Sequence, residues 1–187
     1  MKTLLLMRHA KSSWKDEKLE DQDRPLNKKG RHDAPMMGQI LVDHELVPQA
    51  ILSSSALRAR QTAEAVAEAA HYDGDVTYLD RLYMAEPEDY INALRELPNE
   101  VERVLLIGHN PGLEMLLQLL SGQIQSMPTA VIAHLDLPID HWSDLSMSTT
   151  GELAEIWRPK EVVEEVKEEK GKEKGKKSKP KEKSKKK

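Results

Sequence analysis

Short apolar runs alternate along the chain with longer segments in which apolar residues recur every three or four positions. The runs occupy residues 3–7, 50–52, 76–79 and 104–107. Uninterrupted runs of this length, bounded by charged or turn-forming residues, are typical of strands buried on both faces of a sheet. Two later segments, 130–137 and 152–157, also read as strands. Because no helical segment separates these two, we expect them to pair antiparallel at an edge of the sheet.

Helical periodicity fills the gaps between the runs. We expect helices from Asn27, as N-cap, to a point before Pro48, and then over 56–70, 87–97 and 113–120. Strands that alternate with helices favour a mainly parallel sheet covered on both faces. The pattern therefore predicts a three-layer α/β/α sandwich with a mainly parallel central sheet and an antiparallel edge strand.

The charges are distributed unevenly along the 187 residues. Residues 160–187 hold 13 Lys and 7 Glu, which leaves 15 basic and 25 acidic residues in 1–159. We expect one domain over 1–160 and a Lys/Glu-rich tail over 161–187, with a short helix over 161–170 and disorder from 171. The favoured interpretation of the tail is a solubilising segment. The alternative is electrostatic binding of an acidic partner, anionic lipid or nucleic acid, the last weak and unspecific because the tail has no aromatic residue.

The chain contains no cysteine, which excludes disulfides and thiolate metal sites. The apolar run at 4–7 is too short for a signal peptide, and no stretch reaches the roughly 20 apolar residues of a membrane span. We therefore expect a cytoplasmic protein without a membrane span.

Three of the predicted strands end in polar side chains. The first ends in Arg8 and His9, the second leads into SSSALRARQT with Arg58, and the fourth is followed by His109. The carboxyl ends of parallel strands lie along one edge of the sheet, where ligands bind. That edge could assemble all four side chains in one cleft. Two neighbouring arginines favour an anion between them, and their planar forks suit a phosphoryl group.

Two histidines in a phosphate pocket can divide the chemistry between them. A neutral histidine can attack phosphorus, and a second can hydrogen-bond the oxygens of the group in transfer. Each feature alone has a plainer interpretation, as a surface Arg-His pair, a Gly-His-Asn turn or a solvated helix arginine. If these plainer interpretations all held, the three polar motifs would lie at three separate strand ends by coincidence. No carboxylate pair accompanies His9 and His109, so we expect no metal and no cofactor.

Taken in order, these segments resemble the motifs of the histidine phosphatase superfamily. Arg8-His9-Ala10, after the first strand, resembles the family's Arg-His-Gly tripeptide, in a variant common among SixA-like phosphohistidine phosphatases. The segment at 54–64 is similar to the family's Ser-x-x-x-Arg-Ala-x-x-Thr element. The segment at 105–114 is similar to the one that holds the family's second catalytic histidine. DRPLNKKG, at 23–30, resembles the segment that leads into the first helix, and the likeness covers 1–160. The matching residues are Arg8, His9, Ala10, Ser54, Arg58, Ala59, Thr62 and His109.

The resemblance implies a metal-independent phosphatase that works in two steps. His9 attacks phosphorus and becomes phosphohistidine, and water then hydrolyses this intermediate. The implied phosphate-binding residues are Arg8, Arg58 and His109, with Ser12 and Lys15 as secondary candidates. For Lys15 the favoured interpretation is a surface charge.

One departure from the family's pattern bears on the substrate. Met84 takes the place of a glutamate general acid, and Glu86 and Glu88 lie nearby but off register. A missing acid typically costs about 10²–10⁴-fold when an alkoxide must leave, whereas a leaving imidazole is a far weaker base. We therefore expect phosphohistidine on a protein as substrate, with phosphotransfer domains or sugar-phosphotransferase carriers as partners by resemblance. Two alternatives remain: a phosphatase of small phosphoesters that recruits Glu86 or Glu88, and a non-catalytic module that docks phosphoproteins.

Overall fold

A six-stranded sheet forms the centre of the protein, for which a computed structural model describes residues 1–163. The strands lie in the order β3-β2-β4-β1-β5-β6. The first four in the chain are parallel, β5 runs antiparallel to β1, and β6 runs antiparallel to β5 at the edge. The mainly parallel sheet with an antiparallel edge strand is thus confirmed. The strands are β1 (Lys2–Arg8), β2 (Ala50–Ser54), β3 (Val76–Leu79), β4 (Arg103–Gly108), β5 (Ile132–Leu137) and β6 (Glu152–Trp157).

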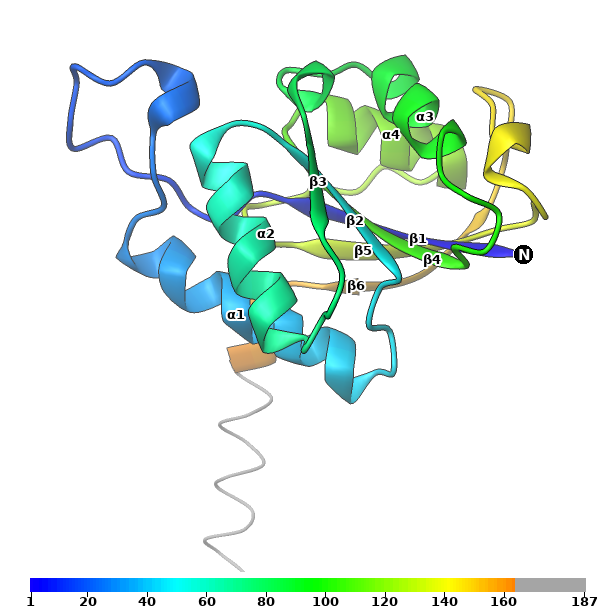
Figure 1. The fold of residues 1–187 in the computed structure, drawn as a ribbon, viewed down its shortest axis with the longest axis horizontal. Helices are drawn as coiled ribbons and strands as arrows, with labels where there is room; N and C mark the ends of the chain where they lie inside the picture. Colours follow the sequence, from blue (N-terminus) through cyan, green and yellow to red (C-terminus); the bar gives the residue numbers. More distant parts are fainter. Residues whose placement is uncertain (164–187) are drawn as a thin grey trace, which may run out of the picture.

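Helices cover both faces of the sheet, which confirms the predicted sandwich (Figure 1). Two helices, α1 and α2, pack together on one face, and the shorter α3 and α4 lie on the other. Short 3-10 helices interrupt three of the connections. The helices are α1 (Lys28–Asp43), α2 (Leu57–Ala69), α3 (Pro87–Arg95) and α4 (Gly112–Ser121), with η1 (Asp21–Asp23), η2 (Asp80–Leu82) and η3 (Trp142–Asp144).

Strand β1 shows why an uninterrupted apolar run is required at the centre of this sheet. Successive side chains of a strand point to opposite faces. Leu4 and Leu6 therefore pack against α3 and α4, while Leu5 and Met7 pack against α1 and α2, and all four are fully buried. Burial of each such side chain stabilises the fold by about 1.5–3 kcal/mol. The strand is thereby held rigidly from both sides, which fixes the residues at its carboxyl end.

The helix ends lie close to their predicted positions. Asn27 is the N-cap of α1, because its side-chain oxygen accepts a hydrogen bond of 2.9 Å from the Gly30 amide. This helix ends at Asp43, five positions before Pro48. Helix α4 ends where Gly122 adopts a left-handed conformation with φ 70°.

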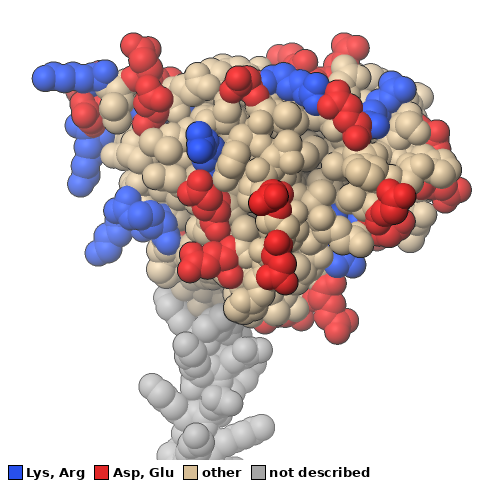
Figure 2. Space-filling view, viewed as in Figure 1, with Lys and Arg blue, Asp and Glu red and all other residues tan. Residues whose placement is uncertain are grey.

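The predicted tail falls mostly outside the described residues. Val162, in the first turn of the predicted tail, is buried against the cluster formed by α1 and α2. The predicted disorder from 171 lies outside the described residues altogether. Acidic side chains are dispersed over the face seen in Figure 2, as the excess of acidic residues in 1–159 requires. None of the helices within residues 1–163 is long and apolar enough to cross a membrane.

Candidate active site

The predicted strand-end side chains meet in one cleft at the carboxyl ends of β1, β2 and β4. Arg8 pairs with Gly108 in the parallel register, which makes His9 and His109 neighbours, with ring centroids 5.0 Å apart. Arg58, in the first turn of α2, reaches both rings. Arg8, His9, Arg58 and His109 all line the cleft, which has a volume of about 470 Å³.

The His9 ring is held in one orientation and one tautomer. Its Nδ1 lies 2.8 Å from the Ala10 carbonyl oxygen, which can only accept, so Nδ1 carries the proton. Its Nε2 is then unprotonated and accepts a hydrogen bond of 3.4 Å from Arg58 Nε. The amide of Ala10 donates to Thr62 Oγ1 at 3.0 Å, which ties the turn after β1 to α2. The cleft thus presents a nitrogen lone pair beside a guanidinium.

The His109 ring is held in the opposite tautomer to that of His9. Its Nδ1 accepts from Arg58 Nη2 at 3.4 Å, so the proton is on Nε2, which donates to Ser54 Oγ at 2.8 Å. The Tyr90 hydroxyl accepts a hydrogen bond of 3.1 Å from the His109 amide. His109 therefore faces the cleft with Nδ1, the atom that would donate to a bound oxyanion once protonated.

Arg58 connects the two histidines to a carboxylate that the sequence analysis did not single out. Its Nη1 donates to the Asp21 carbonyl oxygen at 2.6 Å, and its Nη2 donates to Asp21 Oδ2 at 2.9 Å. Asp21 belongs to η1, in the loop between β1 and α1, which folds back over the cleft. The loop brings Asp21 to the arginine that the resemblance places on the phosphate.

The same loop contributes a third arginine. Arg24 is buried and donates to Ser12 Oγ at 2.7 Å and to the Ser13 carbonyl oxygen at 3.0 Å. Its guanidinium lies 3.1 Å from the centroid of the Trp14 ring. Ser12, a secondary phosphate candidate, lines the cleft with its hydroxyl already bonded to Arg24. The sequence offered one signal for Arg24, the DRPLNKKG segment in which it stands.

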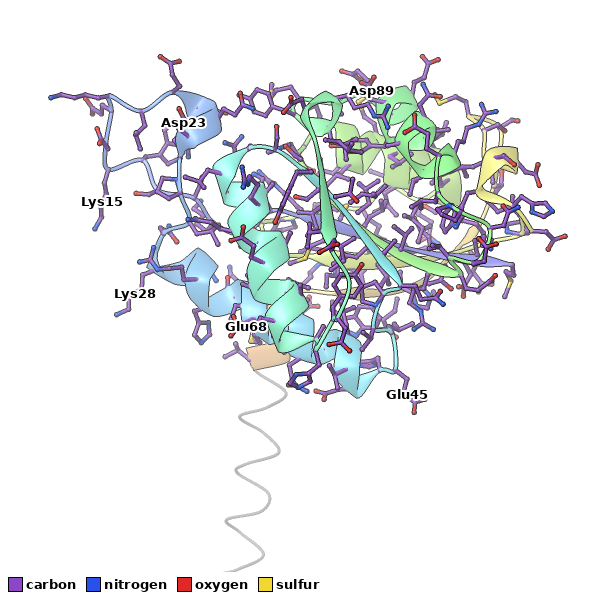
Figure 3. The ribbon with its side chains drawn as sticks, in the orientation of Figure 1. Lys15, Asp23, Lys28, Glu45, Glu68 and Asp89 are labelled. Atoms are coloured by element: carbon purple, nitrogen blue, oxygen red, sulfur yellow. The ribbon has the colours of Figure 1, made fainter. Side chains whose placement is uncertain are left out.

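Lys15, the other secondary candidate, is exposed and is not among the residues that line the cleft. Figure 3 shows it at the outer edge of the loop, directed away from the body of the domain. Lys11 lines the cleft instead. The structure therefore places Lys15 as a surface charge, the interpretation that the sequence favoured.

Neither glutamate near Met84 lines the cleft. Glu86 is the N-cap of α3 and forms a capping box with Asp89, whose side chain accepts from the Glu86 amide at 2.9 Å. Glu88 is exposed in the first turn of the same helix. Met84, by contrast, lines the cleft, so the position of the missing acid holds a thioether.

Positive charge dominates the cleft. Arg8, Lys11, Arg24 and Arg58 line it against a single carboxylate from the described residues, that of Asp21. Arg8 Nη1 donates to the Met127 carbonyl oxygen, whereas its buried Nε has no hydrogen-bond partner within residues 1–163. An orphaned buried donor among cations is the environment that an oxyanion satisfies.

Two other hollows in the surface are larger than the cleft but lack its set of side chains. Larger hollows, of about 640 and 900 Å³, lie beside the first turn of α1 and along the groove between α1 and α2. Neither combines paired histidines with arginines. Within residues 1–163, no group of three His, Asp or Glu side chains is placed to hold a metal ion.

Both cleft histidines should remain uncharged well below neutral pH. Burial, followed by the charges of Arg58 and Arg8, lowers the pKa of His9 to about 4. Burial, His9 and Arg58 lower the pKa of His109 to about 3. As pH falls below about 6.5, the unfolded chain takes up protons that the folded chain refuses, so stability falls with pH. The loss is at most about 1.4 kcal/mol per pH unit for each histidine.

The measurement is a proton NMR titration of the His9 and His109 ring signals, with the free energy of unfolding at pH 7 and pH 5. We expect midpoints near 4 or lower and a smaller loss of stability in His109→Asn than in the wild type. Midpoints near 6.5 for both rings would contradict this electrostatic description of the cleft.

Known proteins match the parts of the chain that carry these motifs. A sequence model of the histidine phosphatase superfamily (branch 1) matches residues 4–83, which include Arg8, His9 and Arg58. An uncharacterised chloroplast protein of Arabidopsis thaliana is 35% identical over 153 residues, covering 75% of this chain and 69% of its own length.

Two solved structures share the fold over most of their length. One, assigned as the phosphohistidine phosphatase SixA of Agrobacterium tumefaciens, is 31% identical with a TM-score of 0.72, over 84% of this chain and 98% of that one. The other, a protein histidine phosphatase SixA complexed with tungstate, is 25% identical with a TM-score of 0.73, over 86% of this chain and 99% of that one. The paired histidines, the arginine cluster and these relatives lead to one conclusion, that the chain belongs to the histidine phosphatase superfamily (branch 1).

Proposed function

We propose that this phosphatase hydrolyses phosphohistidine on a protein through a covalent intermediate on His9. The main support for the proposal is the tautomer and orientation of the His9 ring. Its Nδ1 proton is bound to the Ala10 carbonyl, and its Nε2 lone pair lies on the cleft floor beside Arg58. A neutral, oriented imidazole among cations is a competent nucleophile toward phosphorus.

In the first step His9 Nε2 attacks phosphorus as the bond to the leaving group breaks. Arg8 and Arg58 bind the phosphoryl oxygens. The negative charge that arrives raises the proton affinity of His109 Nδ1, which takes up a proton from solvent and then donates a hydrogen bond to an oxygen. In the second step water attacks phosphorus and the bond from phosphorus to His9 Nε2 breaks. Inorganic phosphate keeps the protons of the water, and His9 is released as neutral imidazole. The arginines supply the positive charge in both steps, and the mechanism assigns no role to a metal ion.

Three features support a phosphorylated protein as the substrate. The two solved relatives named above are protein or phosphohistidine phosphatases in their own descriptions. Met84 stands where an acid would protonate an alkoxide, and Glu86 is committed to capping α3. Trp14 and Met84 line the cleft with 73% and 65% of their surface exposed, an open apolar rim that suits a side chain carried by another protein.

The proposal predicts an order of substrates. We expect turnover of a histidine-phosphorylated carrier protein and of p-nitrophenyl phosphate, whose leaving group needs no proton. An alkyl phosphate should be slower by about 10²–10⁴-fold, because the one carboxyl group among the described residues that line the cleft, that of Asp21, is ionised and does not serve as a general acid. The measurement is kcat/KM for the three substrates with wild type and His9→Ala.

Rapid turnover of the alkyl phosphate would favour the alternative, a phosphatase of small phosphoesters. Tight phosphate binding without any turnover would favour a non-catalytic docking module. The cytoplasmic location, the domain boundary at 160 and the role of the basic tail remain predictions of the sequence.

A further inference from the structure

Asp21 is the only carboxylate among the described residues that line the cleft, and the mechanism above does not use it. Its Oδ1 accepts from Arg24 Nη1 at 2.8 Å, and its Oδ2 accepts from Arg58 Nη2 and from the Tyr83 hydroxyl at 2.9 and 2.8 Å. Partial burial opposes ionisation, but hydrogen bonds from Tyr83 and Arg24 and the charge of Arg58 lower the pKa of Asp21 to about 2. The carboxylate is therefore ionised and fixed in place by three donors.

The position of Asp21 relative to the nucleophile indicates what it can contact. His9, Arg58 and His109 form the floor, with only 8%, 5% and 4% of their surface exposed. The Asp21 side chain is 45% exposed, and it shares the mouth with the exposed Trp14 and Met84. In an in-line displacement the leaving group departs on the side opposite to the nucleophile. A nucleophile on the floor sends the leaving group toward the mouth, where the carboxylate lies.

We propose that Asp21 is a specificity residue that contacts the leaving group and selects leaving groups able to present an N–H or a positive charge to its carboxylate. The inference rests on the proposed attack by His9. It assigns to Asp21 the recognition of an imidazole leaving group, a task for which the sequence pattern supplied no residue.

The chemistry of P–N cleavage explains why an ionised carboxylate is useful here. As the bond from phosphorus to His9 Nε2 forms, the bond from phosphorus to the substrate nitrogen breaks, and its electron pair returns to that nitrogen. If the distal ring nitrogen carries a proton, the leaving group is neutral imidazole; without that proton it is the far more basic imidazolate. A carboxylate that accepts the distal N–H stabilises the protonated ring, and no proton transfer to the carboxylate is required.

The same carboxylate disfavours other substrates. A departing alkoxide or phenolate develops negative charge beside Asp21 and is repelled. Asp21 also holds Arg58 and Arg24, so it competes with an arriving phosphoryl group for their donors. Removing its charge should therefore slow cleavage of P–N substrates without slowing cleavage of P–O substrates.

The test uses the full chain, with phosphoimidazole and p-nitrophenyl phosphate as probes and the variant Asp21→Asn. Asp23→Asn is the matched control, because Asp23 lies in the same η1 turn, is exposed and does not line the cleft (Figure 3). We expect Asp21→Asn to lower kcat/KM for phosphoimidazole by roughly 10–100-fold, the size of a lost hydrogen bond to a charged group. For p-nitrophenyl phosphate we expect an unchanged or higher kcat/KM, and Asp23→Asn should match the wild type on both.

A pH profile separates contact with the leaving group from mere support of Arg58. The alkaline limb of kcat for phosphoimidazole should move to lower pH by roughly one unit in Asp21→Asn, because the protonated ring loses its partner. Equal losses on both probes, or an unmoved alkaline limb, would overturn the inference. A wild type that hydrolyses p-nitrophenyl phosphate but not phosphoimidazole would instead overturn the proposed function, so the two failures are distinguishable.

Discussion

Replacing His9 with alanine is expected to lower kcat by about 10⁴-fold or more, the scale of loss seen when an enzyme's nucleophile is removed. From residues 1–163, the other ring nitrogen lone pair that faces the cleft is that of His109 Nδ1, which the proposed mechanism uses, once protonated, to bind a phosphoryl oxygen and not to attack phosphorus. The measurement is kcat on p-nitrophenyl phosphate, together with the melting temperature. The fold should persist because only two side-chain hydrogen bonds, to the Ala10 carbonyl and from Arg58, are lost.

His141→Ala is the control, because His141 is exposed and does not line the cleft. The control should keep wild-type kcat. A His9→Ala protein that retains its fold and more than a tenth of the wild-type rate would contradict the assignment of His9 as nucleophile.

Replacing Arg58 with alanine should produce the second large effect, a loss of about 10²–10⁴-fold in kcat/KM. This is the size expected for two hydrogen bonds between charged groups at about 1.5–3 kcal/mol each. The substitution removes a phosphate donor, releases both histidine rings and leaves the Asp21 carboxylate without one of its partners. Arg58→Lys keeps the charge but not the fork, so its loss should be intermediate.

Arg60 provides a matched control on the same helix. It is exposed and lies over the Tyr78 ring, away from the cleft. Arg60→Ala should leave kcat/KM within about twofold of the wild type, as surface substitutions usually do. If Arg58→Ala resembles Arg60→Ala, Arg58 does not bind the phosphoryl group.

The part of the site on the sheet could be predicted from the sequence because its geometry follows from topology. Apolar runs such as Leu4–Met7 predict buried strands, and parallel strands bring their carboxyl ends to one edge. Arg8, His9 and His109 therefore had to lie along one edge once the sheet was parallel, and the structure adds that β1 and β4 are adjacent strands. Arg58 follows from the same rule, one helical turn after β2.

The part of the site on the loop could not be predicted in this way. Asp21 and Arg24 reach the cleft because residues between β1 and α1 fold back, held by Ser12, Ser13 and the Trp14 ring. No periodicity specifies where such a loop lies, since its path depends on individual side-chain contacts.

The glutamates near Met84 show a related limit. Their spacing suggested a substitute acid, but Glu86 meets the requirements of an N-cap with Asp89 three residues later. A Glu-x-x-Asp sequence differs from the usual Ser/Thr-x-x-Glu/Gln capping box, so this role of Glu86 could not be predicted from the sequence pattern.

The proposed mechanism requires that a phosphoryl group reside on His9 during turnover. The most direct measurement is to mix the protein with a histidine-phosphorylated carrier labelled with ³²P, quench in alkaline denaturant within one turnover, and map the label. We predict acid-labile label on the peptide that contains His9, and none in His9→Ala. Turnover with no label on the protein, or with label on another residue, would contradict a covalent intermediate on His9.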